Sequence, residues 1–312
     1  MAISLQVVKD ILSLYPFGEC LGCTPLTGGT VQMNFRLDTA ARPCVLRYYR
    51  QNRTFDSVRF EINLLTYLKK RSYPCPAPLK NDMGHYIGMY EGRPYALFEF
   101  MDGHPVPVPT EHQQRQIIEK AALLHNLTKR YRPRHRQERW NYSAGLCQSL
   151  AEQQTRKLDT PEAADKLEWL RRELSHLFLP VSIPKGICHG DFHFSNVLFL
   201  NETLSAVLDF DDANYTFLLF DLVVLIEMWA WPYDRLQLDF AAARKIVTEY
   251  TSHRPLSVNE KRHLFDVYRL SILMDCVWYF SRGSGGDFYE RQKMDFLGSV
   301  GREHFQRALF DT

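Results

Sequence analysis

Three oxygen-bearing side chains follow apolar runs in the middle of the chain. Asp191 stands five residues before Asn196, and Asp209 follows a second apolar run at 206–208. Phosphoryl transfer needs a carboxylate that orients an attacking hydroxyl and accepts its proton, and oxygen ligands that hold Mg²⁺ against the nucleotide phosphates. The sequence therefore predicts Asp191 as a catalytic base and Asn196 and Asp209 as Mg²⁺ ligands. The alternative is that all three are ordinary turn residues.

The elements that position these side chains divide the chain by secondary-structure type. Apolar alternation broken by turns predicts strands at 19–26, 32–38, 43–49, 85–90 and 95–100. One helix with an N-cap at Asp56 interrupts these strands and ends before Pro74. From Glu111 onward the apolar spacing is helical, and further helices are expected near 161–178, 217–231, 239–252 and 258–280.

The predicted fold class is therefore α+β, with two lobes of unequal size. A small antiparallel-sheet lobe with one main helix is expected at 1–100, and a larger, mainly helical lobe at 101–312. The hinge between them is expected at about 98–104, close to several prolines. The length of 312 residues agrees with roughly two domains at about 150 residues each.

Composition excludes several classes of protein. The chain is 45% hydrophobic, and 38 basic residues against 36 acidic ones give a net charge of +2. Fibrous and disordered classes are excluded, and no basic surplus points to nucleic acid or to a membrane surface. The basic run at 129–139 is expected to be a solvated loop. The apolar stretch at 217–231 is too short for a membrane span and predicts a buried helix.

Cysteine usage indicates a reducing compartment. The seven cysteines have no framework spacing, so we expect reduced thiols and a cytoplasmic protein without a signal peptide. Cys20 and Cys23 form a CxxC, but no second pair or suitably spaced histidine accompanies it. The expected role of that pair is structural.

The order of these elements and motifs resembles the aminoglycoside phosphotransferase and choline kinase superfamily, which shares the bilobal protein-kinase-like fold. The resemblance covers about residues 20–280. Within that superfamily the chain is most similar to the type II homoserine kinases, through 26–29 (LTGG), 75–78 (CPAP), 220–222 (FDL) leading into 229–231 (WAW), and 254–257 (RPLS).

The resemblance implies ATP and Mg²⁺ as cofactors and gives roles to residues of the first lobe. A loop over the phosphates is implied at Thr27, Gly28, Gly29, Thr30 and Val31. Arg47 stands where protein kinases have a phosphate-pairing lysine, and Glu61 in the following helix is its implied partner. The adenine-binding hinge is implied at Phe98, Glu99, Phe100 and Met101.

The acceptor is expected to be a small molecule with a hydroxyl and an amine. Residues 205–240 hold seven acidic side chains against one basic one, which suits homoserine, an amino alcohol or an aminoglycoside. The candidate acceptor-binding residues are His193, Asp211, Asp212 and, for a carboxylate, Arg282. Asp211 and Asp212 either assist the metal or face the acceptor.

Gly190 and His193 look more like the antibiotic and stress-kinase branches of the superfamily. An aminoglycoside phosphotransferase and a stress-type Ser/Thr protein kinase of the same fold therefore stay open as alternatives. A third alternative is a catalytically silent binding protein that keeps the scaffold.

Overall fold

The computed structural model describes residues 4–26, 32–49, 53–232, 234–281 and 288–311. The predicted phosphate loop at 27–31 and the predicted acceptor residue Arg282 lie outside them. The chain forms two compact units, each described here by itself. The first comprises 1–108, 132–139 and 195–211, and the second comprises 109–131, 140–194 and 212–312. In the described ranges no helix is long and apolar enough to cross a membrane.

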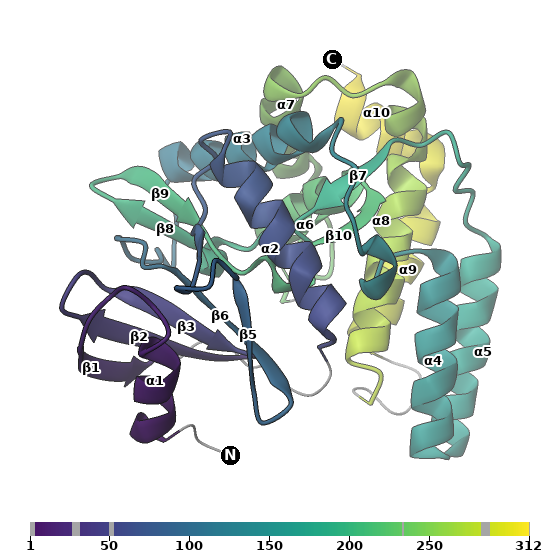
Figure 1. Ribbon diagram of the computed structural model, residues 1–312. Helices are drawn as coiled ribbons and strands as arrows, with labels where there is room; N and C mark the ends of the chain where they lie inside the picture. Colours follow the sequence, from purple (N-terminus) through teal and green to yellow (C-terminus); the bar gives the residue numbers. More distant parts are fainter. Residues whose placement is uncertain (1–3, 27–31, 50–52, 233, 282–287, 312) are drawn as a thin grey trace. The chain divides into compact units, whose positions relative to one another are not determined.

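An antiparallel sheet forms the body of the first unit (Figure 1). Its strand order is β1-β2-β3-β6-β4, with β5 also paired to β6. The strands are β1 (Cys20–Pro25), β2 (Met33–Thr39), β3 (Cys44–Tyr48), β4 (Pro78–Leu79), β5 (Ile87–Tyr90) and β6 (Arg93–Glu99). Five of these six strands lie where the sequence predicts them. The expected α+β fold class with an antiparallel sheet in its N-terminal part is confirmed.

One face of this sheet packs into an apolar core. Leu37, Leu46 and Leu97 on three neighbouring strands are fully buried, and they join a cluster with residues of α1 (Leu5–Leu12). The main helix is α2 (Phe55–Lys69). Its N-cap is Thr54, whose hydroxyl accepts from the Ser57 amide, so the prediction of Asp56 as N-cap is wrong. An acidic residue in the first turn is favourable there too, which explains the similar signal.

Two segments beyond residue 108, at 132–139 and 195–211, belong to the first unit. The hairpin of β8 (Val197–Leu200) and β9 (Thr203–Val207) joins it through paired backbone bonds between His104 and Phe199. Gly103 lies so close to the hairpin that a Cβ there would be 2.8 Å from the Phe199 carbonyl oxygen. The units are therefore not the two continuous stretches 1–100 and 101–312, because pairing across this hairpin outweighs proximity in the sequence.

The second unit is mainly helical. Its helices are α3 (Glu111–Thr128), α4 (Ala144–Leu158), α5 (Pro161–Ser175), α6 (Leu219–Ala230), α7 (Phe240–His253), α8 (Val258–Trp278), α9 (Tyr289–Val300) and α10 (Arg302–Phe310). The strands β7 (Lys185–Cys188) and β10 (Asn214–Phe217) pair antiparallel. In Figure 1, α4 and α5 lie side by side.

The sequence misses four of the helices, namely α1, α4, α9 and α10. In α4 only Cys147 and Ala151 are buried, so few large apolar residues mark its inner face. A single residue, Gly301, with φ +71°, separates α9 from α10. The expected buried helix at 217–231 is confirmed as α6, most of which is buried.

Candidate active site

Asn196 and Asp209 lie at the open end of the β8–β9 hairpin. Val197 pairs with Val207, so the residues before and after these strands are neighbours. The Leu208 amide donates to the Asn196 carbonyl oxygen at 2.7 Å and closes the arrangement. Asp209 has a left-handed backbone with φ +60°, which is uncommon for a residue other than glycine. The structure thus brings the two predicted metal ligands together in the first unit.

Arg47 on β3 connects three other side chains of the first unit. Its Nη1 lies 2.8 Å from Glu61 Oε1, its Nε donates to Asn34 Oδ1 at 3.0 Å, and its Nη2 lies 3.4 Å from Asp209 Oδ1. Tyr49 donates to the second oxygen of Glu61 at 2.9 Å. The expected Arg47–Glu61 pair is present, and it also reaches the proposed metal site.

Burial and charge oppose each other at this ion pair. The Glu61 side chain is 1% exposed, and burial raises its pKa although Arg47 acts in the opposite direction. For Arg47, burial alone would lower the pKa, but the Glu61 and Asp209 carboxylates outweigh burial and raise it. Arg47 therefore stays a cation, which the expected role in phosphate binding requires.

Asp211 lies in a buried arginine clamp, defined here as Arg53, Arg139 and Asp211. Arg53 donates to Asp211 Oδ2 at 2.7 Å and to its carbonyl oxygen at 3.2 Å, and Arg139 also donates to that carbonyl. Gln32 donates to the same carboxylate at 3.1 Å. Burial would raise the pKa of Asp211, but Arg53 and Arg47 outweigh it and lower the pKa.

The arginine clamp changes two sequence expectations. Asp211 is 5% exposed, and its carboxylate accepts a hydrogen bond from Arg53. It therefore orders the loop after Asp209 and is poorly placed for the predicted contact with an acceptor. Arg139 is 6% exposed and bonds the Ser57 hydroxyl of α2 at 3.1 Å. The expectation that the whole basic run is solvated is therefore wrong at Arg139, because it is buried against the Ser57 hydroxyl and the Asp211 carbonyl oxygen, which lie far away in the sequence.

The predicted adenine hinge follows the end of β6. Phe98 is buried, and the Glu99 carboxylate pairs with Lys69 at 2.7 Å and accepts from the Ala77 amide. The Arg36 guanidinium lies 4.4 Å from the centre of the Phe100 ring. Met101 is half-buried. The side chains of Glu99 and Phe100 thus have partners inside the first unit.

In the second unit, Asp191 lies on the loop after β7. The buried carboxylate of Asp221 on α6 accepts from the His189 amide at 2.8 Å and from the Gly190 amide at 3.0 Å. His125 bonds the same carboxylate at 3.0 Å. Burial would raise the pKa of Asp221, but the hydrogen bond and charge of His125, together with the contacts of His189, outweigh burial and lower the pKa. Asp221 thus orients the backbone of the loop that carries Asp191.

Gly190 fits a space that no side chain could enter. Its φ is +84°, and a Cβ would lie 2.7 Å from the Asp212 carbonyl oxygen and 3.1 Å from Asn214 Nδ2. Asp191, the next residue, is exposed, and its carbonyl oxygen accepts from the His193 amide at 2.8 Å. Burial lowers the pKa of His193, although Asp191 opposes the shift. His193 therefore tends toward the neutral imidazole, which makes it a poor anchor for a negatively charged acceptor group.

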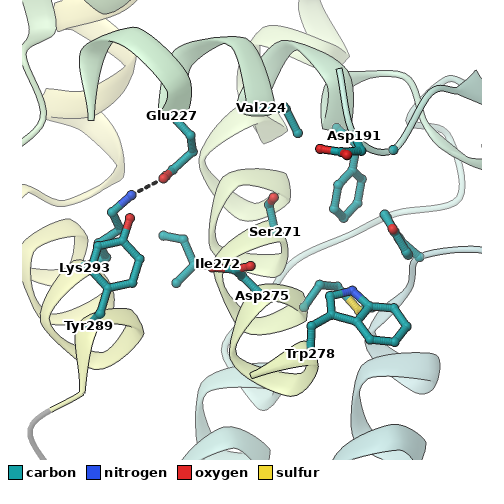
Figure 2. Close-up of a pocket in the computed structure, with 13 residues that line it drawn as sticks. Asp191, Val224, Glu227, Ser271, Ile272, Asp275, Trp278, Tyr289 and Lys293 are labelled. Carbon is teal, nitrogen blue, oxygen red and sulfur yellow. Dashed lines mark hydrogen bonds and ion pairs between the residues drawn. The ribbon is translucent and has the colours of Figure 1, made fainter. Parts of the chain in front are cut away.

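A cavity of about 240 Å³ borders Asp191 in the second unit. Helices α6, α8 and α9 supply most of its lining, including Glu227, Asp275 and Lys293. Figure 2 shows Asp191 at one end of the drawn side chains and the Glu227–Lys293 ion pair at the other, with Val224 and Ser271 between them. The cavity thus joins a catalytic candidate to a charged pair.

Comparison with known proteins identifies the family. Residues 22–256 match the profile of the family described as "Phosphotransferase enzyme family". The chain belongs to this phosphotransferase family. It is 30% identical over 263 residues to the homoserine kinase of Rhodospirillum rubrum, covering 82% of this chain and 80% of the relative. It is 26% identical over 303 residues to the homoserine kinase of Sinorhizobium medicae, covering 95% and 87%.

Solved structures of similar fold are also phosphotransferases. Amicoumacin kinase hAmiN, in complex with AMP-PNP, Ca²⁺ and Ami, has a TM-score of 0.67 at 15% identity over 97% of this chain and 93% of that one. A microcompartment-associated aminopropanol kinase has a TM-score of 0.63 at 17% identity, covering 98% of both chains. These likenesses confirm the expected protein-kinase-like fold class.

The donor atoms of this phosphotransferase suit a hard divalent cation. Asn196 offers an amide oxygen, and the Asp209 carboxylate is 42% exposed beside it. Such oxygen ligands are what Mg²⁺ prefers. Another group of possible metal-ligand side chains, His125, Cys188 and Asp221, is buried, and His125 already bonds Asp221 and the Tyr250 hydroxyl. That cluster is explained by its own hydrogen bonds.

Sequence reasoning missed the charged lining of the cavity. Lys293 and Asp275 are not among the residues predicted from the sequence, and Glu227 enters there only as one of the seven acidic side chains at 205–240. The available signal was weak. Glu227 is an isolated carboxylate on a mostly apolar helix, while its partner Lys293 lies 66 residues away on a helix that the apolar spacing does not reveal.

Proposed function

We propose that the chain is an ATP- and Mg²⁺-dependent kinase that phosphorylates the hydroxyl of homoserine or a close analogue. As a phosphotransferase it transfers phosphate to an alcohol of a small molecule. ATP is supported by fold neighbours solved with AMP-PNP and ADP. Mg²⁺ is proposed from the oxygen donors of Asn196 and Asp209. When bound, Mg²⁺ would neutralise negative charge on the nucleotide phosphates.

The first unit is proposed to hold the nucleotide. Arg47 would bind phosphate oxygens as a planar fork, with its orientation fixed by Glu61 and Asn34. Thr27, Gly28, Gly29, Thr30 and Val31 would cover the phosphates, and Phe98, Glu99, Phe100 and Met101 would receive the adenine through their backbone. The arginine clamp would keep the loop after Asp209 in place.

Asp191 is proposed to orient and deprotonate the acceptor hydroxyl. The hydroxyl oxygen forms a bond to the γ-phosphorus, the bond to the ADP oxygen breaks, and the hydroxyl proton passes to the Asp191 carboxylate. Asp221 would keep Asp191 in position through the backbone of the two preceding residues. Alignment of the reacting atoms can account for about 7 to 11 kcal/mol of the barrier, more than proton transfer usually contributes.

One observation carries the choice of acceptor. The cavity beside Asp191 has two further carboxylates in its lining, Glu227 and Asp275, as a protonated amine requires. Its volume of about 240 Å³ is below the roughly 300–1,000 Å³ of sites for drug-sized ligands, which favours a small acceptor over an aminoglycoside. The relatives at 30% and 26% identity are named homoserine kinases.

The test is a screen of ATP consumption over homoserine, amino alcohols, amino sugars and aminoglycosides. We expect the highest kcat/KM with homoserine, a requirement for Mg²⁺, and loss of turnover in Asp191→Asn. Asp165→Asn, an exposed aspartate on α5, is the matched control and keeps wild-type turnover. Drug tolerance conferred on a susceptible host, or labelling of proteins by ATP, would instead support the antibiotic-kinase or protein-kinase alternative.

The cysteines fit a cytoplasmic location, which we also propose. All seven are free thiols, and five of them are buried. Free cysteines are expected where thiols stay reduced.

A further inference from the structure

The Glu227–Lys293 pair occupies one end of the cavity in an unusual setting for charged groups. The Lys293 side chain is 3% exposed, and its Nζ contacts Glu227 Oε2 and donates to the Trp231 carbonyl oxygen at 2.9 Å. The ammonium also lies 4.6 Å from the ring centres of Trp231 and Tyr289. The Glu227 side chain is 25% exposed, and among the described residues its buried Oε1 has no hydrogen-bond partner.

The charged side chains along the cavity are acidic, apart from Lys293 of this pair. Among the thirteen described residues that line it, the acidic side chains are Asp191, Glu227 and Asp275, and Lys293 is the single basic one. Within the described part of the chain, two of the three ammonium hydrogens serve Glu227 and the Trp231 carbonyl oxygen, which leaves one donor for a ligand. A cavity meant only for a cationic acceptor gains nothing from a buried lysine, because like charges repel.

We propose that Glu227 and Lys293 together recognise the α-ammonium and α-carboxylate of an amino-acid acceptor, while the acceptor hydroxyl lies at Asp191. This inference rests on the proposed function and deepens it by naming the acceptor class as zwitterionic. The ammonium of the acceptor pairs with Glu227, and its carboxylate takes the remaining donor of Lys293. The arrangement in Figure 2, with the pair at one end and Asp191 at the other, matches a molecule with a charged head and a terminal hydroxyl.

The physical basis is charge balance. The Glu227–Lys293 pair has no net charge, and the ammonium and carboxylate of the acceptor also have none. Neither protein group is left buried without a partner when the zwitterion binds. An amino alcohol brings a cation beside Lys293 without a carboxylate, and a hydroxy acid brings an anion beside Glu227 without an ammonium. Each hydrogen bond to a charged group corresponds to about 10- to 150-fold in affinity. Selection among these three acceptors therefore measures the roles of the two residues separately.

The experiment compares three acceptors that differ by one group. L-homoserine carries both charges, 3-amino-1-propanol lacks the carboxylate, and 4-hydroxybutyrate lacks the amine. We expect the wild-type protein to prefer homoserine over both analogues by at least about 10-fold in kcat/KM. Lys293→Met should lower kcat/KM for homoserine by about 10- to 150-fold, mainly through KM, and leave that for 3-amino-1-propanol unchanged or higher.

Glu227→Gln gives the complementary result. It should lower kcat/KM for homoserine and for 3-amino-1-propanol but not for 4-hydroxybutyrate. The matched control is Lys245→Met, an exposed lysine on α7, which should leave all three acceptors at wild-type values. Retained turnover of 3-amino-1-propanol by Lys293→Met shows that the variant is folded. If it fails to fold, the double variant Glu227→Gln with Lys293→Met leaves no unpaired charge and should lose selection among the three acceptors.

Two outcomes overturn the inference in different ways. If the wild-type protein phosphorylates homoserine and Lys293→Met, or the double variant, keeps its preference over 3-amino-1-propanol, the pair does not read the zwitterion and the proposed function stands. If the wild-type protein uses 3-amino-1-propanol as well as homoserine, both the inference and homoserine as the preferred acceptor fail.

Discussion

Replacing Arg47 by methionine is expected to be strongly destabilising, and the structure gives the size of the effect. Methionine keeps much of the aliphatic volume but removes the contacts to Glu61, Asn34 and Asp209 at 2.8, 3.0 and 3.4 Å. Glu61 would then be a carboxylate, 1% exposed, and the Tyr49 hydroxyl would be its remaining hydrogen-bond donor among the described residues. Removing one member of a buried ion pair costs about 3–5 kcal/mol.

A charge pair on the same sheet supplies the control. Arg36 on β2 pairs with Asp38 at 2.9 Å, but the two side chains are 40% and 42% exposed. Exposed pairs contribute about 0–1 kcal/mol, so Arg36→Met should change the free energy of unfolding much less than Arg47→Met. The double variant Arg47→Met with Glu61→Leu should cost less than the sum of its single changes, because no unpaired charge is left in the core.

The measurement is urea unfolding followed by far-ultraviolet circular dichroism. This signal reports on both units, whereas all five tryptophans lie in the second. A cost of 3–5 kcal/mol also corresponds to a fall of roughly 6–20 °C in melting temperature for a unit of this size. If Arg47→Met costs less than about 1 kcal/mol, or no more than Arg36→Met, then the pair is not desolvated and the reasoning from burial is wrong.

Three further variants test other parts of the site. Asp209→Asn is chosen because asparagine tolerates the left-handed backbone. It should lower kcat at least as much as Asp191→Ala does, and thus by at least about 100-fold. Wild-type turnover in either variant refutes the role proposed for the residue that was replaced. Gly190→Ala should lower the free energy of unfolding by about 1–3 kcal/mol, since its φ is +84° and its Cβ meets backbone, whereas Gly145→Ala in α4 has open space and should not destabilise. Because the pKa of Asp221 is lowered on folding, its ionised form stabilises the protein above the ordinary carboxylate range, and this is lost as pH falls through the lowered pKa. In urea titrations Asp221→Asn should therefore have a lower free energy of unfolding than the wild type at pH 7, and this difference should shrink below about pH 4. A difference that does not change with pH contradicts the reasoning.

The fold was predictable where local signals are strong. In β2 apolar and polar residues alternate, and α2 and α6 have long apolar faces, so the positions of these elements follow from the sequence. Two of the helices that were missed, α4 and α10, bury two residues each. Their place depends on packing against other helices, which a single sequence does not display. The same limit applies to the hairpin at 197–207, which joins the first unit through backbone pairing.

The candidate site was predictable as a set of residue types but only partly as a set of contacts. Asn196 and Asp209 were expected to act together, and the hairpin register explains why they are neighbours. The pairing of Arg47 with Glu61 was also expected and is present. By contrast, the arginine clamp and the Glu227–Lys293 pair join residues that lie 66 or more positions apart. Spacing in the sequence carries no information on such contacts.

These distant pairs change how the acidic stretch at 205–240 acts on an acceptor. Counted along the sequence, its charges favour any cationic acceptor. In the structure, Asp211 is neutralised by the arginine clamp, Asp221 is bonded to His125 and two backbone amides, and Glu227 is paired with Lys293. Much of the apparent negative charge is therefore compensated within each unit. The cavity proposed for the acceptor has a carboxylate and an ammonium side by side, and such a site would select by the arrangement of charges on the acceptor, not by its net charge.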